Sequence, residues 1–168
     1  MATISTRSTF IHGQWTAPDS AQLYGIPDWG KGYVAVTPAG HLTVLPGKDP
    51  AKAIDLYEVV EGLRARGVHT PVLLRFNDIL VHRLREIRKA FDDAMTEQQY
   101  GANGGGGYSC VYPIKVNQQR HVCEEIANLA VELNFGLEAG SKPELLAVLG
   151  LSASAGGPGV NGMPIICN

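Results

Sequence analysis

Apolar positions along the chain recur with two periods, one typical of helices and one typical of buried strands. A helix is predicted over 78–91, because steps of four, three and four residues place its apolar positions on one helical face. These positions are Leu80, Leu84, Ile87 and Phe91. A stripe with the same kind of spacing predicts a second helix over 122–133. Continuous apolar runs at 108–116, 135–139 and 164–167 predict strands.

From residue 108 onward these elements alternate as strand, helix, strand, helix and strand. Ser141 has the position of an N-cap for the last helix, with Glu144 three residues later to complete a capping box, and we expect this helix to reach about Leu149. Such alternation predicts an α/β fold with parallel strands and right-handed crossovers, either an open sheet or a barrel. Three parallel strands cannot close a barrel, so we expect the chain to be a fragment of a longer protein.

The N-terminal part of the chain has weaker patterns. Residues 1–23 are expected to form an irregular leader, and two short apolar runs around Thr-Pro-Ala-Gly predict a hairpin in a small β domain that includes 24–50. A short helix over 54–66 and a strand over 71–76 should follow. The expected organisation is therefore a leader (1–23), part of a β domain (24–50) and the first portion of a barrel (51–168).

Composition and net charge indicate which classes of binding partner are not expected. The chain has 168 residues, of which 45% are hydrophobic and 18% charged, as in a soluble globular protein. A net charge of −2 gives no reason to expect a nucleic acid or a membrane as partner. The basic residues between 83 and 89 are interspersed with acidic ones, which favours a solvated helix face. Three widely spaced cysteines indicate neither a disulfide framework nor a zinc site, so a reducing cytoplasm fits.

Several other residues could bind a ligand or a metal ion by their type, but we assign them structural roles. The glycine-rich stretch 101–107 lacks the Gly-Lys-Ser/Thr of a phosphate-binding loop, so we expect a flexible surface loop. His121 and Cys123 are too few for a metal site. The aromatic residues near the small β domain, which are Trp15, Trp29 and Tyr33, are expected to belong to its core.

Lys115 is the candidate residue for chemistry. It lies within an apolar run, where burying an ammonium group without a partner is costly. One interpretation is that Lys115 ends the strand and extends its amine into water. The other is a functional lysine, since the C-terminal ends of barrel strands line the active-site mouth, where an amine can form a Schiff base. The residue pattern alone leaves both open.

Four motifs together resemble the biosynthetic arginine decarboxylases. They are YGIPDWG (24–30), YPIKVNQ (112–118), GLEAGSKPEL (136–145) and IICN (165–168), in this order along the chain. The resemblance implies an alanine-racemase-like (β/α)8 barrel that binds pyridoxal 5'-phosphate and follows a small β element. It also implies that Lys115 forms the Schiff base with the cofactor and that Glu138 lies near the cofactor. Without the resemblance, Glu138 is equally expected to pair with Lys142 or to cap the following helix.

The implied reaction converts L-arginine to agmatine and carbon dioxide in polyamine biosynthesis. The resemblance further implies a magnesium requirement, but no metal ligand in this chain, and a cytoplasmic homo-oligomer in the full-length form. The isolated chain is expected to be inactive, because later barrel strands and the C-terminal β domain are missing from it. Two alternatives remain: a related decarboxylase acting on ornithine or diaminopimelate, and a non-catalytic truncated or regulatory fragment.

Overall fold

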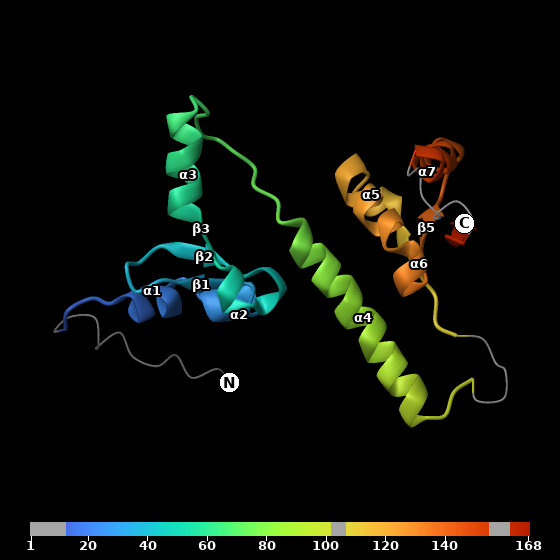
Figure 1. Ribbon diagram of the computed structural model, residues 1–168, viewed down its shortest axis with the longest axis horizontal. Coiled ribbons are helices and arrows are strands. Elements are labelled where there is room, and N and C mark those ends of the chain that lie inside the picture. Colours follow the sequence, from blue (N-terminus) through green and yellow to red (C-terminus); the bar gives the residue numbers. More distant parts are fainter. Residues whose placement is uncertain (1–12, 102–106, 155–161) are drawn as a thin grey trace, which may run out of the picture. The chain divides into compact units, whose positions relative to one another are not determined.

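The chain forms two compact units in the computed structural model, which describes residues 13–101, 107–154 and 162–168. The first unit ends at Arg75 and the second begins at Phe76 (Figure 1). This division falls later than the expected boundary at residue 50, because the segment after it completes the sheet of the first unit.

The first unit contains an antiparallel three-stranded sheet with β2 in the middle. The predicted hairpin is confirmed: β1 (Val34–Val36) pairs with β2 (Leu42–Val44) around Thr-Pro-Ala-Gly. A third strand, β3 (Ile54–Asp55), pairs with β2 and was not predicted. The remaining elements are α1 (Ala17–Leu23), α2 (Ile26–Gly30), the 3-10 turns η1 (Pro46–Lys48) and η2 (Pro50–Lys52), and α3 (Leu56–Ala65).

The expectation of an irregular leader is wrong for its last part, where α1 forms. A capping box between Thr16 and Asp19 begins this helix, and Pro18 lies in its first turn. The helix has no buried residue. With seven residues it is also too short for an apolar period to be recognised in the sequence. Residues 1–12 lie outside the described part of the chain.

The predicted strand at 71–76 is also absent from the described structure. The segment has no regular secondary structure, and Leu73 is 73% exposed. A strand needs a neighbour for its backbone hydrogen bonds, and no described strand pairs with this segment. The short helix before it is confirmed as α3, although Asp55 caps it and so delays its start to Leu56.

The second unit alternates helices with a parallel sheet in the order β4-β5-β6. The predicted parallel α/β pattern is confirmed, and β5 has the predicted bounds. The 108–116 run becomes a shorter strand followed by a 3-10 turn. The elements are α4 (Asn77–Glu97), β4 (Cys110–Pro113), η3 (Ile114–Val116), α5 (Arg120–Asn128), α6 (Ala130–Leu133), β5 (Phe135–Ala139), α7 (Lys142–Ser154) and β6 (Ile165–Cys167).

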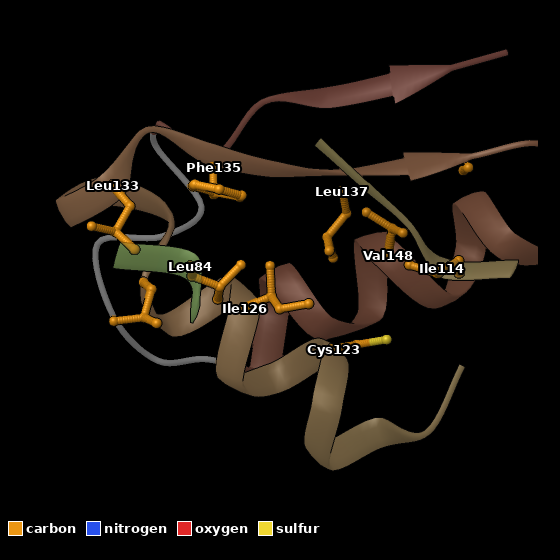
Figure 2. Close-up of a cluster of buried hydrophobic side chains, with 10 residues drawn as sticks. Leu84, Ile114, Cys123, Ile126, Leu133, Phe135, Leu137 and Val148 are labelled. Carbon is orange, nitrogen blue, oxygen red and sulfur yellow. The ribbon is translucent and has the colours of Figure 1, made fainter. Parts of the chain in front are cut away.

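A cluster of buried side chains joins the helices to one face of this sheet. Figure 2 shows Phe135 and Leu137 pointing from β5 toward Ile126 of α5 and Val148 of α7. Leu137, Ile126 and Val148 are each fully buried. Successive side chains of a strand point to opposite faces. Gly136 and Glu138 therefore face the side of the sheet that lies away from this cluster.

The charged positions of α4 behave as predicted for a solvated face. Arg83 pairs with Glu86, Lys89 with Asp93, and Arg85 with Glu132 of α6. Arg88 pairs with Asp92 and also donates to the carbonyl oxygens of Tyr108 and Leu133. These contacts occupy the guanidinium and ammonium groups within the unit. No helix among the described residues is both long and apolar enough to cross a membrane.

The prediction of an aromatic core in the first unit is confirmed only for Tyr33, which is buried. Trp15 and Trp29 are about half exposed, at 49% and 57%. Their indole N–H groups donate locally, to the Ser20 hydroxyl at 2.6 Å and the Tyr24 carbonyl at 3.0 Å. Satisfying these donors near the surface leaves both rings outside the core.

Candidate active site

The two predicted site residues lie at the same edge of the parallel sheet. The carboxyl ends of parallel strands meet at one edge, where ligands of α/β proteins commonly bind. Lys115 follows the end of β4 within η3, and Glu138 is the fourth residue of β5. The register pairs Glu138 with Pro113, only two residues before Lys115. The fold therefore brings a lysine and a carboxylate to neighbouring strand ends.

Lys115 extends from a turn that is fixed to the core on one side. Ile114, directly before it, is 2% exposed and belongs to the buried cluster. Lys115 itself is exposed, and Val116 is 70% exposed. The buried isoleucine thus directs the backbone so that the lysine side chain reaches solvent at the sheet edge. This exposure agrees with both interpretations of Lys115, since a cofactor lysine also needs an accessible amine.

Asn117 holds the other side of the turn. Its backbone carbonyl accepts hydrogen bonds from the Tyr112 hydroxyl at 3.3 Å and from the Cys123 thiol at 3.6 Å. Its side-chain Oδ1 accepts from the backbone N–H of Gln119 at 3.1 Å, at the entry to α5. Lys115 therefore lies between a buried side chain and a backbone carbonyl with two side-chain donors.

Glu138 is half-buried and faces away from the helices. Its two structural alternatives are not realised among the described residues. No ion pair there joins Glu138 to Lys142, and the start of α7 is held by other groups. The Ser141 hydroxyl accepts from the Glu144 N–H at 3.4 Å, while Glu144 Oε2 accepts from the Gly140 N–H at 2.8 Å. The predicted N-cap at Ser141 is thus confirmed, although Glu144 bonds to the N–H of Gly140 and not to that of Ser141 as in a capping box.

Two further residues lie near the site: Tyr112, which the sequence patterns do not single out, and Cys123, which they exclude only as a metal ligand. Cys123 is 2% exposed, and burial raises the pKa of its thiol. Burial, aided by the neighbouring Cys123, also raises the pKa of Tyr112 above its usual value. Both groups therefore remain protonated and able to donate near neutral pH. A contact between residues 117 and 123 depends on how α5 folds back, which spacing alone does not reveal. His121, by contrast, is exposed.

The predicted loop at 101–107 lies largely outside the described residues, since 102–106 are not described. Asn168, at the end of β6, donates its backbone N–H to the Ala139 carbonyl at 3.1 Å, which extends the pairing of β5 with β6. It thereby lies at the same carboxyl edge as Lys115 and Glu138.

The fold and the site define the second unit as part of an α/β protein with a lysine at the carboxyl edge of a parallel sheet. No protein-family model matches the chain. A biosynthetic arginine decarboxylase of Rhodopirellula baltica is 42% identical over 161 residues, which are 96% of this chain and 22% of the relative. Biosynthetic arginine decarboxylase 1 of Synechocystis sp. is 46% identical over 138 residues, or 82% of this chain and 19% of that protein.

A solved structure gives the same result. The crystal structure of the biosynthetic arginine decarboxylase from Campylobacter jejuni matches 86% of this chain and 22% of its own, with a TM-score of 0.70 and 32% sequence identity. The chain belongs to the family of biosynthetic arginine decarboxylases. It spans about a fifth of the length of the curated relatives that it matches.

Proposed function

We propose that this chain forms part of a pyridoxal phosphate-dependent decarboxylase that converts L-arginine to agmatine and carbon dioxide, a step of polyamine biosynthesis. The observation that carries the proposal is the identity of 42% to 47% with biosynthetic arginine decarboxylases over most of the chain. We further propose that Lys115 is the residue that holds the cofactor. Its exposed amine at the carboxyl edge of a parallel sheet supports this assignment.

The donor set at this edge fits pyridoxal phosphate. Lys115 offers a primary amine that can bond covalently to an aldehyde, and Glu138 offers a carboxylate from the next strand. When bound, the cofactor supplies a ring that takes up the electrons left when carbon dioxide departs from the substrate. Lys115 would anchor and orient the cofactor. Glu138, at the end of the neighbouring strand, would place negative charge near it.

The remaining expectations are proposals of the same kind. A larger (β/α)8 barrel, a homo-oligomer and a cytoplasmic location follow from family membership. Magnesium has the same basis only: among the residues with described structure, no group of three or more His, Cys, Asp or Glu side chains is arranged to hold a metal ion. We propose no metal ligand in this chain.

Activity should require more than these 168 residues. The chain corresponds to about a fifth of its relatives, and its described sheet has three parallel strands. One wall of an active site leaves a bound substrate open to water, which weakens the electrostatic interactions that catalysis uses. We therefore propose that the chain alone does not turn over arginine.

The substrate is tested by carbon dioxide release from labelled arginine, ornithine and diaminopimelate. The protein to use is the full product of the gene that contains this sequence. We expect release from arginine, together with agmatine, and its loss by at least a thousandfold in Lys115→Ala, because the covalent anchor is gone. Lys142→Ala, which removes a lysine from the start of α7, is the matched control and should retain activity. Release from ornithine or diaminopimelate without release from arginine would refute the substrate assignment.

Cofactor attachment is tested separately, by adding pyridoxal phosphate, reducing with borohydride and mapping the labelled peptide. In the full gene product we expect one dominant label, at Lys115. The chain alone should be labelled weakly or not at all. A dominant label at another lysine of the full product would refute the role of Lys115 whatever the substrate.

A further inference from the structure

The turn that carries Lys115 is held by two side chains that come from different elements. Tyr112 lies on β4, before the turn, and Cys123 lies on α5, after it. Both donate to the same acceptor, the backbone carbonyl of Asn117. We call this arrangement of Tyr112, Asn117 and Cys123 the Asn117 clamp.

We infer that the Asn117 clamp fixes the backbone from which Lys115 extends, and that Tyr112 and Cys123 are positioning residues for the cofactor lysine. The inference rests on the proposed role of Lys115. It goes beyond that role because it assigns a function to two residues that contact the backbone of the turn. Their contribution is to the backbone geometry of the turn.

The first step is the direction of the two donors. Tyr112 is in register with Leu137, the fully buried residue of β5. Its ring therefore lies on the helix side of the sheet, where it packs partly buried against the core cluster. From there its hydroxyl reaches forward past the end of β4 to Asn117. Cys123 belongs to the same cluster (Figure 2). Its thiol reaches the same carbonyl from α5.

The second step is the protonation of these donors. A tyrosine or a cysteine holds a carbonyl only while it keeps its proton. Burial raises the pKa of both side chains, so the two donors persist over the physiological pH range. The thiol is the weaker donor, and its 3.6 Å distance is ordinary for a contact that involves sulfur.

The third step is that the turn needs contacts from outside to hold its backbone in place. Lysine has a long side chain with many rotamers, so the position of its amine depends strongly on a fixed backbone. Catalytic groups must be held within a fraction of an ångström of their working position. η3 is only three residues long and cannot fix itself. The buried Ile114 holds one end of this turn, and the clamp holds the other.

Hydrogen exchange of the 168-residue chain tests the clamp without relying on activity. Tyr112→Phe removes the hydroxyl and keeps the ring. We expect about threefold faster amide exchange over 114–119, somewhat less than for an ordinary hydrogen bond, because this contact is long for an O–H···O bond at 3.3 Å. Cys123→Ala should give about a twofold increase, because the thiol is a weak donor. Cys123→Ser restores a donor and should bring the exchange back toward the original rate.

Matched controls remove the same groups elsewhere in the same unit. Tyr100→Phe changes an exposed tyrosine, and Cys167→Ala an exposed cysteine; neither should alter exchange over 114–119. The amide of Leu137, bonded to Pro164 O at 3.0 Å, reports on the core. Unchanged exchange of the turn in both clamp variants would overturn the inference. So would an equal rise at Leu137, because the side chains would then support the whole sheet and not the turn.

A second readout separates this inference from the proposed function. Borohydride labelling of Lys115 by pyridoxal phosphate in the full gene product should fall severalfold in Tyr112→Phe. It should also fall in Cys123→Ala and recover in Cys123→Ser. Absence of labelling in the unmodified protein would reject Lys115 as the cofactor lysine. Labelling that is equal in all variants would reject the positioning role and leave the proposed function in place.

Discussion

The two units of the chain stabilise their sheets in different ways. In the unit up to Arg75 the strands are short and antiparallel, and its buried apolar side chains are few, chiefly Ile26, Tyr33 and Val44. In the unit from Phe76 the strands are parallel, and helices cover one sheet face with a cluster of ten buried residues. Parallel strands need crossover helices, whereas antiparallel strands can be joined by tight turns.

The two units also differ in how their buried and partly buried polar side chains are paired. In the first unit His41 Nδ1 lies 2.8 Å from Asp55 Oδ2, and the imidazole stacks on Tyr57. There the Thr43 hydroxyl is buried without a partner among the described residues, whereas Ser152 of the second unit bonds to the Val148 carbonyl at 3.0 Å. The comparison indicates that the second unit has the larger apolar core, while the first combines few buried side chains with the polar contact between His41 and Asp55. Three substitutions can test this difference.

Leu137→Ala should have the largest effect, because it removes side-chain volume from the centre of the packed unit. Leu137 is fully buried between β5 and the helices. We expect a loss of about 3 kcal/mol in the free energy of unfolding, from lost burial and the cavity that remains. The measurement is urea denaturation, followed by hydrogen exchange read separately over 13–75 and 107–154.

The matched control is Leu146→Ala, on α7, where the leucine is 62% exposed. We expect it to change the free energy of unfolding by no more than about 0.5 kcal/mol. Exchange over 13–75 should be the same in Leu137→Ala as in the original chain. Faster exchange in both units together would show that they unfold as one, and the comparison would fail.

Gly136→Ala should have a smaller effect, confined to the contact between β5 and β6. A Cβ atom at Gly136 would lie 2.0 Å from the Pro164 carbonyl oxygen, which is part of the backbone and cannot swing aside. The strand β6 must then shift, and we expect a cost of about 2 kcal/mol. Exchange should accelerate at the amides of Leu137 and Asn168, which bond to carbonyls across this contact.

Gly150→Ala serves as the control, since a Cβ there meets no atom within 4 Å. This glycine lies within α7, where alanine is the better helix former, so the control should gain up to about 1 kcal/mol. Equal protection of the Leu137 amide in Gly136→Ala and in the original chain would contradict the need for glycine at this strand contact.

The helices and strands of the second unit could be predicted well from the sequence, because each carries a regular pattern of apolar positions. The stripes and runs that end in the buried cluster are long enough to define helices and strands, and β5 has its predicted bounds. The stripe at 122–133 forms two helices separated by a turn at Leu129. The buried face is nevertheless the one expected. Lys115 and Glu138 were placed at strand ends by the same patterns.

The first unit and the clamp could not be predicted in this way. The short strand β3 and the short helix α1 are each held by pairing or capping, and neither carries a periodic apolar signal. The strand expected at 71–76 failed for the opposite reason: its residues favour a strand, but the described structure gives it no partner. Tyr112 and Cys123 meet at one carbonyl only after α5 has folded onto the sheet.

Removing the charge of Asp55 should have the smallest effect, which is a change in pH dependence. Burial alone would raise the pKa of this carboxyl, but hydrogen bonds from His41 and from the backbone N–H groups of Glu58 and Tyr57 outweigh it. The pKa of Asp55 is therefore lower than its usual 3.8. A carboxyl with a lowered pKa stabilises the folded state fully above the unfolded value, and this contribution disappears as the pH falls through the folded value.

Asp55→Asn separates the charge from the cap, because asparagine also caps helices well. We expect the melting temperature of the first unit to fall by a few degrees at pH 7, and this difference from the original chain to shrink below about pH 3.8 as Asp55 becomes protonated. Asp55→Ala removes the cap as well, since Asp55 Oδ1 accepts from the Tyr57 N–H at 2.8 Å, and should melt lower at every pH. A difference between the original chain and Asp55→Asn that stays constant from pH 7 to pH 2 would show that the charge of Asp55 does not stabilise this unit.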